Sequence, residues 1–281
     1  MKQHSDFLRA AAAIKNAEGM VIAAGAGMGV DSGLPDFRGD RGFWNAYPAY
    51  EKLGVNFIGA ANPEHFERDA AFAWGFYGHR ANLYRQTTPH QGFDVLLGWI
   101  DRRGLDYFVV TSNVDNQFQK AKFDSNRIVE VHGSIEHLQC TDPCTRAIWR
   151  NEENISVDLA TMRAINIPKC PRCGHVARPN ILMFGDDTWI PDRTSDQANR
   201  FNNFLATAGK RPLVVVELGA GVAVPTIRGL SEGIGTRRNA TVIRINPRES
   251  HIAEPHISLS CGALEGLSKI AAIVEGSLPG G

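Results

Sequence analysis

Five short, mostly apolar segments along the chain are typical of buried strands, at residues 20–24, 107–110, 128–131, 213–216 and 241–245. Apolar positions recur at helical spacing at residues 7–17 and 93–104, and a further helix is expected around 225–233. Strands that alternate with helices predict an α/β fold with a doubly wound, parallel, Rossmann-like sheet.

Two stretches do not follow this alternation. Residues 43–90 are rich in aromatic side chains and are predicted to be helical, whereas residues 137–177 show little periodicity. We expect both to be insertions that form a smaller lobe within a single domain spanning 1–281. The larger lobe would then comprise residues 1–42, 91–136 and 178–281. A cleft between two lobes is a common place for a ligand to bind.

Length and charge narrow the class of function. A chain of 281 residues can bury a large core. Basic and acidic residues number 30 each, so nothing favours electrostatic capture of nucleic acid or of an anionic membrane. No apolar run approaches the roughly 20 residues that span a bilayer, and the first residues lack the pattern of a signal peptide. We therefore expect a cytoplasmic protein, whose oligomeric state the sequence leaves open.

Four of the five cysteines form two close pairs, Cys140 with Cys144 and Cys170 with Cys173. Two such pairs on turns are typical of a structural zinc ion held tetrahedrally by four thiolates. Four thiolates leave no position for a water ligand, which argues against a catalytic zinc. The fifth cysteine, Cys261, stands at the start of the expected last helix, where a small buried residue is the simpler interpretation. The sequence thus predicts one structural Zn²⁺ in a protein of a reducing compartment.

A glycine-rich segment, residues 25–39, follows the first predicted strand. A strand that runs into such a turn brings backbone amides against a pyrophosphate. The glycines fall at 25, 27, 29 and 33, which departs from the usual G-x-G-x-x-G fingerprint, and Pro-Asp-Phe-Arg follows.

Polar residues follow two other predicted strands. Ser112, Asn113 and Asp115 come after the strand at 107–110, and His132 comes after the strand at 128–131. The carboxyl ends of parallel strands face one crevice, so we expect these side chains to share a pocket with the glycine-rich turn.

Taken in order, these features resemble the sirtuin family over most of the chain. The resemblance rests on the loop at 25–39, the Asn113-x-Asp115 sequence, His132-Gly133, the four paired cysteines and the late Asn246. It implies an NAD-dependent protein-lysine deacylase, acting as a deacetylase or as a desuccinylase or demalonylase. Such an enzyme consumes NAD, takes an acylated protein or peptide as substrate, and releases nicotinamide and O-acyl-ADP-ribose.

The resemblance also assigns roles to matching positions. The NAD site would be lined by Gly25, Ala26, Gly27, Asp36, Phe37, Arg38, Ser112, Asn113, Asp115, Gly219, Ala220, Gly221, Asn246 and Cys261. Asn113 and Asp115 would hold the nicotinamide and ribose, and His132 would be the general base. Residues 178–180 with Phe184 and Gly185 would form a strand that borders the acyl-lysine channel.

Several positions depart from the family pattern. Ser112 stands where the family usually has Gln, Gly29-Val30 replaces Ser-Ala, and Ala220-Gly221 replaces Thr-Ser.

The segments 113–120, 140–144 and 217–219 resemble microbial sirtuins linked to macrodomain operons. Members of that subgroup are protein ADP-ribosyltransferases and lack the histidine, so His132 favours deacylation here. A protein mono-ADP-ribosyltransferase is the first alternative. A non-catalytic NAD sensor whose zinc lobe binds a partner, and simple NAD hydrolysis, are the others.

Tyr77 and Arg80 have the Tyr-x-x-Arg spacing with which some sirtuins bind the carboxylate of succinyl- or malonyl-lysine. The alternative is that Tyr77 packs within its helix while Arg80 is solvated or paired with a carboxylate. Asp40, close after the glycine-rich loop, would repel an acidic acyl group. The sequence therefore leaves the acyl group open.

Overall fold

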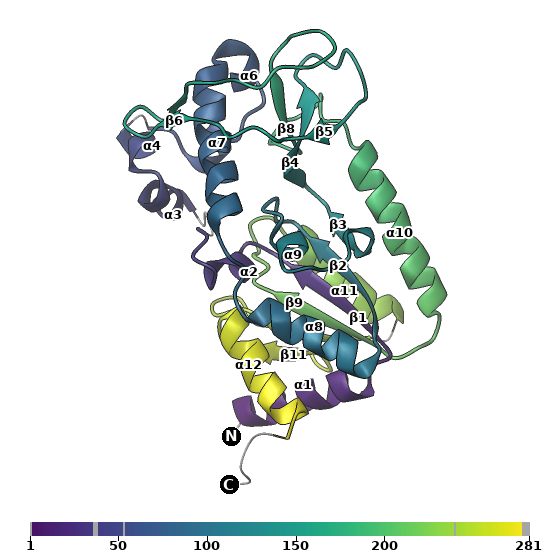
Figure 1. The fold of residues 1–281 in the computed structure, drawn as a ribbon. Coiled ribbons are helices and arrows are strands. Elements are labelled where there is room, and N and C mark those ends of the chain that lie inside the picture. The colour runs from purple at the N-terminus through teal and green to yellow at the C-terminus, as the bar shows by residue number, and fades with distance from the viewer. Residues whose placement is uncertain (1, 36–38, 53, 239, 277–281) are drawn as a thin grey trace.

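A six-stranded parallel sheet forms the centre of the larger part of the molecule. Its strands are β1 (Gly19–Ala24), β2 (Asp106–Thr111), β3 (Ile128–Glu130), β9 (Leu213–Leu218), β10 (Thr241–Ile245) and β11 (Ile257–Leu259). They lie in the order β11-β10-β9-β1-β2-β3 (Figure 1). The structure is a computed structural model that describes residues 2–35, 39–52, 54–238 and 240–276. The predicted parallel α/β architecture is confirmed.

Helices cover both faces of this sheet. One face carries α1 (Lys2–Asn16), α8 (Gly92–Arg103) and α12 (Ala263–Val274), and the other carries α10 (Asp192–Ala208) and α11 (Thr226–Arg238). Within β1, Met20 and Ile22 pack into the first cluster, whereas Val21 and Ala23 pack into the second. Successive side chains of a strand point to opposite faces, so a strand covered on both faces is apolar throughout.

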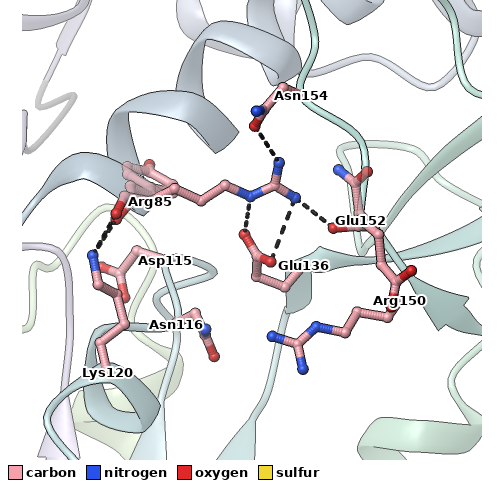
Figure 2. A pocket seen from close by; sticks show the side chains of 10 residues that line it. Arg85, Asp115, Asn116, Lys120, Glu136, Arg150, Glu152 and Asn154 are labelled. Carbon is pink, nitrogen blue, oxygen red and sulfur yellow. Dashed lines mark hydrogen bonds and ion pairs between the residues drawn. The ribbon is translucent and has the colours of Figure 1, made fainter.

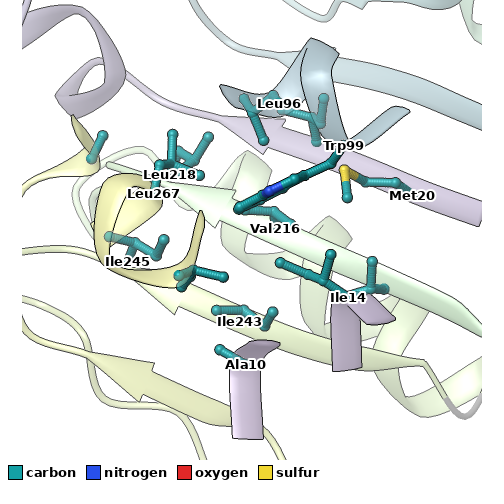
Figure 3. Packing of buried hydrophobic residues seen from close by; sticks show 14 of the residues in the cluster. Ala10, Ile14, Met20, Leu96, Trp99, Val216, Leu218, Ile243, Ile245 and Leu267 are labelled. Carbon is teal, nitrogen blue, oxygen red and sulfur yellow. The ribbon is translucent and has the colours of Figure 1, made fainter. Parts of the chain in front are cut away.

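The core under α8 shows this packing directly. Trp99 of α8 reaches over the strands that carry Met20 and Val216, and all three side chains are buried (Figure 3). Within the described ranges, no helix is both long and apolar enough to cross a membrane.

The predicted elements of the sheet region are all present and differ from the structure at their ends, whereas helix α10 and the edge strand β11 are not predicted. Each of β1, β2 and β9 is longer than the apolar run that predicts it, and β3 ends one residue earlier, at Glu130. The sequence does not predict β11, because a strand of three residues is too short to show a period of two.

The remaining elements belong to the smaller part of the molecule or to the connections. They are α2 (Gly27–Val30), α3 (Gly39–Ala46), α4 (Pro48–Lys52), α5 (Phe57–Ala60), α6 (His65–Arg68), α7 (Ala70–Gln86), α9 (Gln117–Lys120), a 3-10 helix (Ser125–Arg127), β4 (Gly133–Cys140), β5 (Trp149–Arg150), β6 (Val157–Asp158), β7 (Arg163–Ala164) and β8 (Ala177–Ile181).

The smaller part has its own core. The antiparallel sheet β5-β4-β8 and the hairpin β6-β7 lie beside α6 and α7 (Figure 1). Aromatic rings dominate the interior, where Phe43 contacts Tyr47, Tyr50 and Phe76 at centroid distances of 5.4, 5.6 and 5.8 Å. Since β4 begins at Gly133 and β8 ends at Ile181, the antiparallel sheet extends beyond residues 137–177 at both ends.

A charged pair lies inside the sheet face that α11 covers. Arg244 of β10 and Glu217 of β9 have side chains that are 1% and 0% exposed, and Arg244 Nη2 donates to Glu217 Oε2 at 2.9 Å. Arg244 also donates to Glu232 of α11 at 2.8 Å and to the carbonyl oxygen of His251 at 2.9 Å. A buried charge needs such partners, because desolvation alone would be costly.

The two glutamates that accept hydrogen bonds from Arg244 are expected to contribute very differently to the free energy of unfolding. Glu217→Gln removes charge from a fully buried pair and is expected to lower the free energy of unfolding by about 3–5 kcal/mol. Glu232→Gln removes a partner that is 52% exposed, and the expected loss is about 0–1 kcal/mol. Urea denaturation followed by circular dichroism measures both, and equal losses would refute the assignment of the buried pair.

Candidate active site

Two glycine turns meet backbone to backbone at the carboxyl edge of the sheet. The first follows β1 and the second follows β9, and Gly27 N donates to Gly219 O at 3.0 Å. A Cβ on Gly219 would lie 2.4 Å from the Gly27 Cα, and Gly219 has φ +60°. A Cβ on Gly25 would lie 2.8 Å from the Ala220 Cα. Glycine is therefore required where the two turns touch, at the edge where parallel sheets bind ligands.

Asn113 lies against the first of these turns. Its Nδ2 donates to Gly25 O at 3.1 Å, and its backbone N donates to Thr111 Oγ1 at 3.0 Å. Ser112 N donates to Ala24 O at 3.0 Å, which continues the pairing of β2 with β1 for one residue. The structure thus brings Ser112 and Asn113, which follow β2, beside the end of β1 and the first glycine turn.

Asp115 lies deeper, with only 8% of its surface exposed. Burial raises the pKa of its carboxyl to about 6, and the charge of Glu130 acts in the same direction. The backbone N of Gln117 donates to Asp115 Oδ1 at 3.0 Å. This hydrogen bond and the charge of Arg80 limit the rise in the pKa of Asp115. At neutral pH this carboxylate carries its charge in a site with little solvent.

His132 stands two residues beyond the end of β3 and is half-buried. Burial lowers the pKa of its imidazole below 6.5, and a hydrogen bond with the backbone of Ser112 partly offsets this. The imidazole is therefore close to the Ser112–Asn113 segment and is neutral at pH 7. A neutral imidazole can accept a proton from a bound hydroxyl group.

Asn246 joins the second glycine turn to the loop after β10. It is fully buried, its Nδ2 donates to Ala220 O at 2.9 Å, and its Oδ1 accepts from Glu249 N at 2.9 Å. Glu249 in turn accepts from Val222 N at 3.1 Å, next to Gly221. The sequence did not mark Glu249, because it lies in an irregular loop with no motif of its own.

Cys261 is buried at the start of α12, as its small size suggests. It belongs to the apolar cluster under α1 and α8, and burial raises the pKa of its thiol to about 11. Nearby, Leu264 N donates to Asp31 Oδ2 at 2.8 Å, so the start of α12 lies beside the end of α2. The remaining predicted NAD-site residues, Asp36, Phe37 and Arg38, lie outside the described residues.

Tyr77 and Arg80 of α7 lie inside the smaller core. Tyr77 is 1% exposed with its ring 5.7 Å from that of Phe66, and burial raises the pKa of its hydroxyl to about 12. Arg80 is 7% exposed, its guanidinium lies 5.0 Å from the Phe76 ring centre, and its Nε donates to Tyr84 Oη at 3.0 Å. Aromatic faces attract a cation in such a position.

Phe184 and Gly185 lie in a turn after β8, which itself ends at Ile181. The strand expected over residues 178–185 is therefore shorter than predicted. Phe184 is 41% exposed, and its ring lies edge-on to that of Phe57, with centroids 6.0 Å apart.

Asp115 also lines a polar cavity of about 490 Å³ (Figure 2). Arg85 reaches across it and donates to Glu136 Oε1 at 2.9 Å, while Lys120 Nζ donates to the Arg85 carbonyl at 2.8 Å. These contacts join the end of α7 to β4 and to α9, the short helix that follows Asp115.

The four paired cysteines converge on one point. Their sulfur atoms all lie within 4.8 Å of one another, with Cys140 and Cys173 at 3.6 Å and Cys144 and Cys170 at 3.7 Å. Zinc–sulfur bonds of about 2.3 Å at tetrahedral angles place sulfur atoms about 3.8 Å apart. The donor set and spacing therefore fit a structural zinc ion, as predicted, with no position left for water.

Metal content tests this site directly. We expect about one zinc per chain in the purified protein, because four thiolates form a closed tetrahedral site. Cys170→Ser should lose most of the metal and lower the melting temperature, whereas Cys261→Ser, outside the cluster, should keep it. Elemental analysis beside thermal unfolding makes the comparison; wild-type protein with far less than one zinc would rule the site out.

Comparison with known proteins gives one consistent result. A model of the Sir2 family matches residues 25–207. An NAD-dependent protein deacylase of Pyrococcus furiosus is 31% identical over 207 residues, which covers 73% of this chain and 74% of that protein. The corresponding protein of Pyrococcus abyssi is 30% identical over 247 residues and 88% of each chain.

Solved structures share the fold. The crystal structure of a Sir2 homologue in complex with NAD has a TM-score of 0.72 at 25% identity, covering 96% of this chain and 94% of that one. A Sir2 protein bound to acetylated peptide, 19% identical, has a TM-score of 0.67 and covers 99% of both chains.

Proposed function

Because this chain belongs to the Sir2 family, we propose that it is an NAD-dependent protein-lysine deacylase that releases nicotinamide and O-acyl-ADP-ribose. The observation that carries this proposal is the position of His132, a neutral imidazole hydrogen-bonded to the backbone of Ser112 and so beside Asn113 and the first glycine turn. Relatives that are 30–31% identical are NAD-dependent protein deacylases, and a structural relative binds NAD.

In this proposal one group of residues binds NAD, and Asp115 and His132 act on the reacting ribose. The turns at 25–27 and 219–221 would hold its diphosphate and adenosine through backbone amides, with Asn246 supporting the second turn. NAD supplies the nicotinamide–ribose bond that breaks and the ribose hydroxyl that receives the acyl group. The poorly solvated Asp115 carboxylate would stabilise positive charge that develops on the ribose. His132 would take the proton of the ribose hydroxyl.

The substrate would be an acylated protein or peptide, bound in a channel bordered by Phe184 and Gly185. Arg80 could recognise an acidic acyl group only from within the smaller core, because it is 7% exposed and surrounded by aromatic rings. None of the five cysteines forms a disulfide, which supports a reducing, cytoplasmic setting.

Mass spectrometry of products tests the proposed reaction. Wild-type protein is incubated with NAD and a panel of acetyl-, succinyl- and lipoyl-lysine peptides, and acyl-ADP-ribose together with deacylated lysine is the expected result. His132→Ala should slow acyl removal by about 10²–10⁴-fold, because the proton acceptor is lost, while nicotinamide exchange partly survives. A protein that gains ADP-ribose and keeps its acyl group would instead establish the ADP-ribosyltransferase, and free ADP-ribose without any peptide would establish hydrolysis.

The pH dependence follows from the two buried groups. His132 must be neutral and Asp115 ionised, and the lowered pKa of the first and the raised pKa of the second, about 6, satisfy both conditions at neutral pH. We expect kcat to be flat from about pH 7 to about pH 9 and to fall as either group gains a proton on the acid side. Asp115→Asn should lower kcat and remove one of the acid-side ionisations. A kcat that rises steadily up to about pH 9 would contradict the assignment.

A further inference from the structure

A buried ion pair lies directly beneath the turn that carries Phe184 and Gly185. The side chains of Arg178 in β8 and Asp186 are 1% and 0% exposed. Arg178 Nη1 donates to Asp186 Oδ1 at 3.0 Å, and Nη2 donates to Oδ2 to complete a bidentate contact. Desolvation offsets most of the attraction in such a pair, so its net stabilisation is small. The bidentate contact instead fixes the position of Asp186 relative to Arg178.

The same carboxylate closes the turn on itself. Asp186 Oδ2 accepts from Met183 N at 3.2 Å, and Oδ1 accepts from Thr188 N at 3.2 Å. Arg178 Nη2 also donates to the carbonyl oxygen of Ile181, the last residue of β8, at 2.9 Å. Residues 181–188 are thereby held by two side chains, with Gly185 in the left-handed region at φ +67°.

This turn is joined to the backbone of His132. Leu182 N donates to His132 O at 3.0 Å, and Gly133 pairs with Ile181 across β4 and β8. A Cβ on Gly133 would lie 2.0 Å from the carbonyl oxygen of Asn180, so only glycine after the histidine lets the strands come this close. Phe184, whose side chain is exposed, therefore lies two residues along the chain from a hydrogen bond to the backbone of His132.

We propose that Asp186 is a positioning residue for the acylated substrate: it fixes the Phe184–Gly185 turn relative to His132 and so sets the affinity for acyl-lysine. The inference rests on the proposed deacylase function. NAD binding should not depend on Asp186, because the glycine turns that would hold NAD belong to β1 and β9 of the other sheet.

Steady-state kinetics of Asp186→Asn test the proposal, with the acyl-lysine peptide that wild-type protein turns over fastest. We expect KM for the peptide to rise about tenfold or more, since misplacing a binding group by about 1 Å can cost up to 10²-fold. The KM for NAD should stay within about twofold of wild type. Asp187→Asn is the matched control, since it removes the same charge from the exposed neighbouring residue, and it should leave both constants unchanged. Asp186→Glu keeps the carboxylate and should restore most of the peptide affinity.

A double variant distinguishes loss of positioning from misfolding. This control is needed because Asp186→Asn leaves the Arg178 charge without its buried partner. Arg178→Met combined with Asp186→Leu removes both charges and should fold, yet it should show the same rise in peptide KM. An unchanged peptide KM in this double variant, or an equal rise in both KM values, would overturn the positioning role. Wild-type protein that transfers no acyl group would instead overturn the proposed function, so the two failures are distinguishable.

Discussion

The backbone contact between the two glycine turns is the constraint on which the candidate site depends. Gly27 and Gly219 approach so closely that a methyl group on Gly219 would overlap the opposing backbone. This contact fixes the ends of β1 and β9 against each other at the carboxyl edge of the sheet. Asn113 then reaches Gly25 from the next strand. Because glycine has no side chain, the two turns leave room for a ligand between the strand ends.

Around this edge the protein keeps ionisable groups in places with little water. Asp115 and His132 both have pKa values shifted by burial, in opposite directions, and both shifts leave the group in its basic form at neutral pH. The buried pairs Glu217–Arg244 and Arg178–Asp186 are of another kind, because each charge there has a direct partner. The first joins strands of the parallel sheet, and the second shapes a turn of the smaller part. Paired charges thus maintain geometry, whereas the less compensated ones are available for chemistry.

The smaller part contains two different stabilising features, an aromatic core and a cluster of four cysteines. Its helices surround a core of aromatic rings in contact with one another, which supplies large buried area. The segment from 137 to 177 has short strands, and its four cysteines come together at one end. A metal ion bound there would stabilise this end of the segment, since metal binding contributes directly to folding free energy.

The sequence by itself determined the features that depend on neighbouring residues. Apolar runs predicted five of the six parallel strands, because a strand buried on both faces must be apolar throughout. The glycine spacing and the paired cysteines predicted a ligand-binding edge and a four-sulfur cluster, and the structure brings Gly25, Asn113 and Ser112 together as expected. Only the tertiary structure decided the features that join distant segments. Three features have no signal in the neighbouring sequence. They are the Glu217–Arg244 pair, the burial of Arg80 among aromatic rings, and the contacts by which Asp186 fixes the Phe184 turn. Each depends on which side chains meet after the chain has folded, and on the exclusion of water that makes an unpaired charge costly.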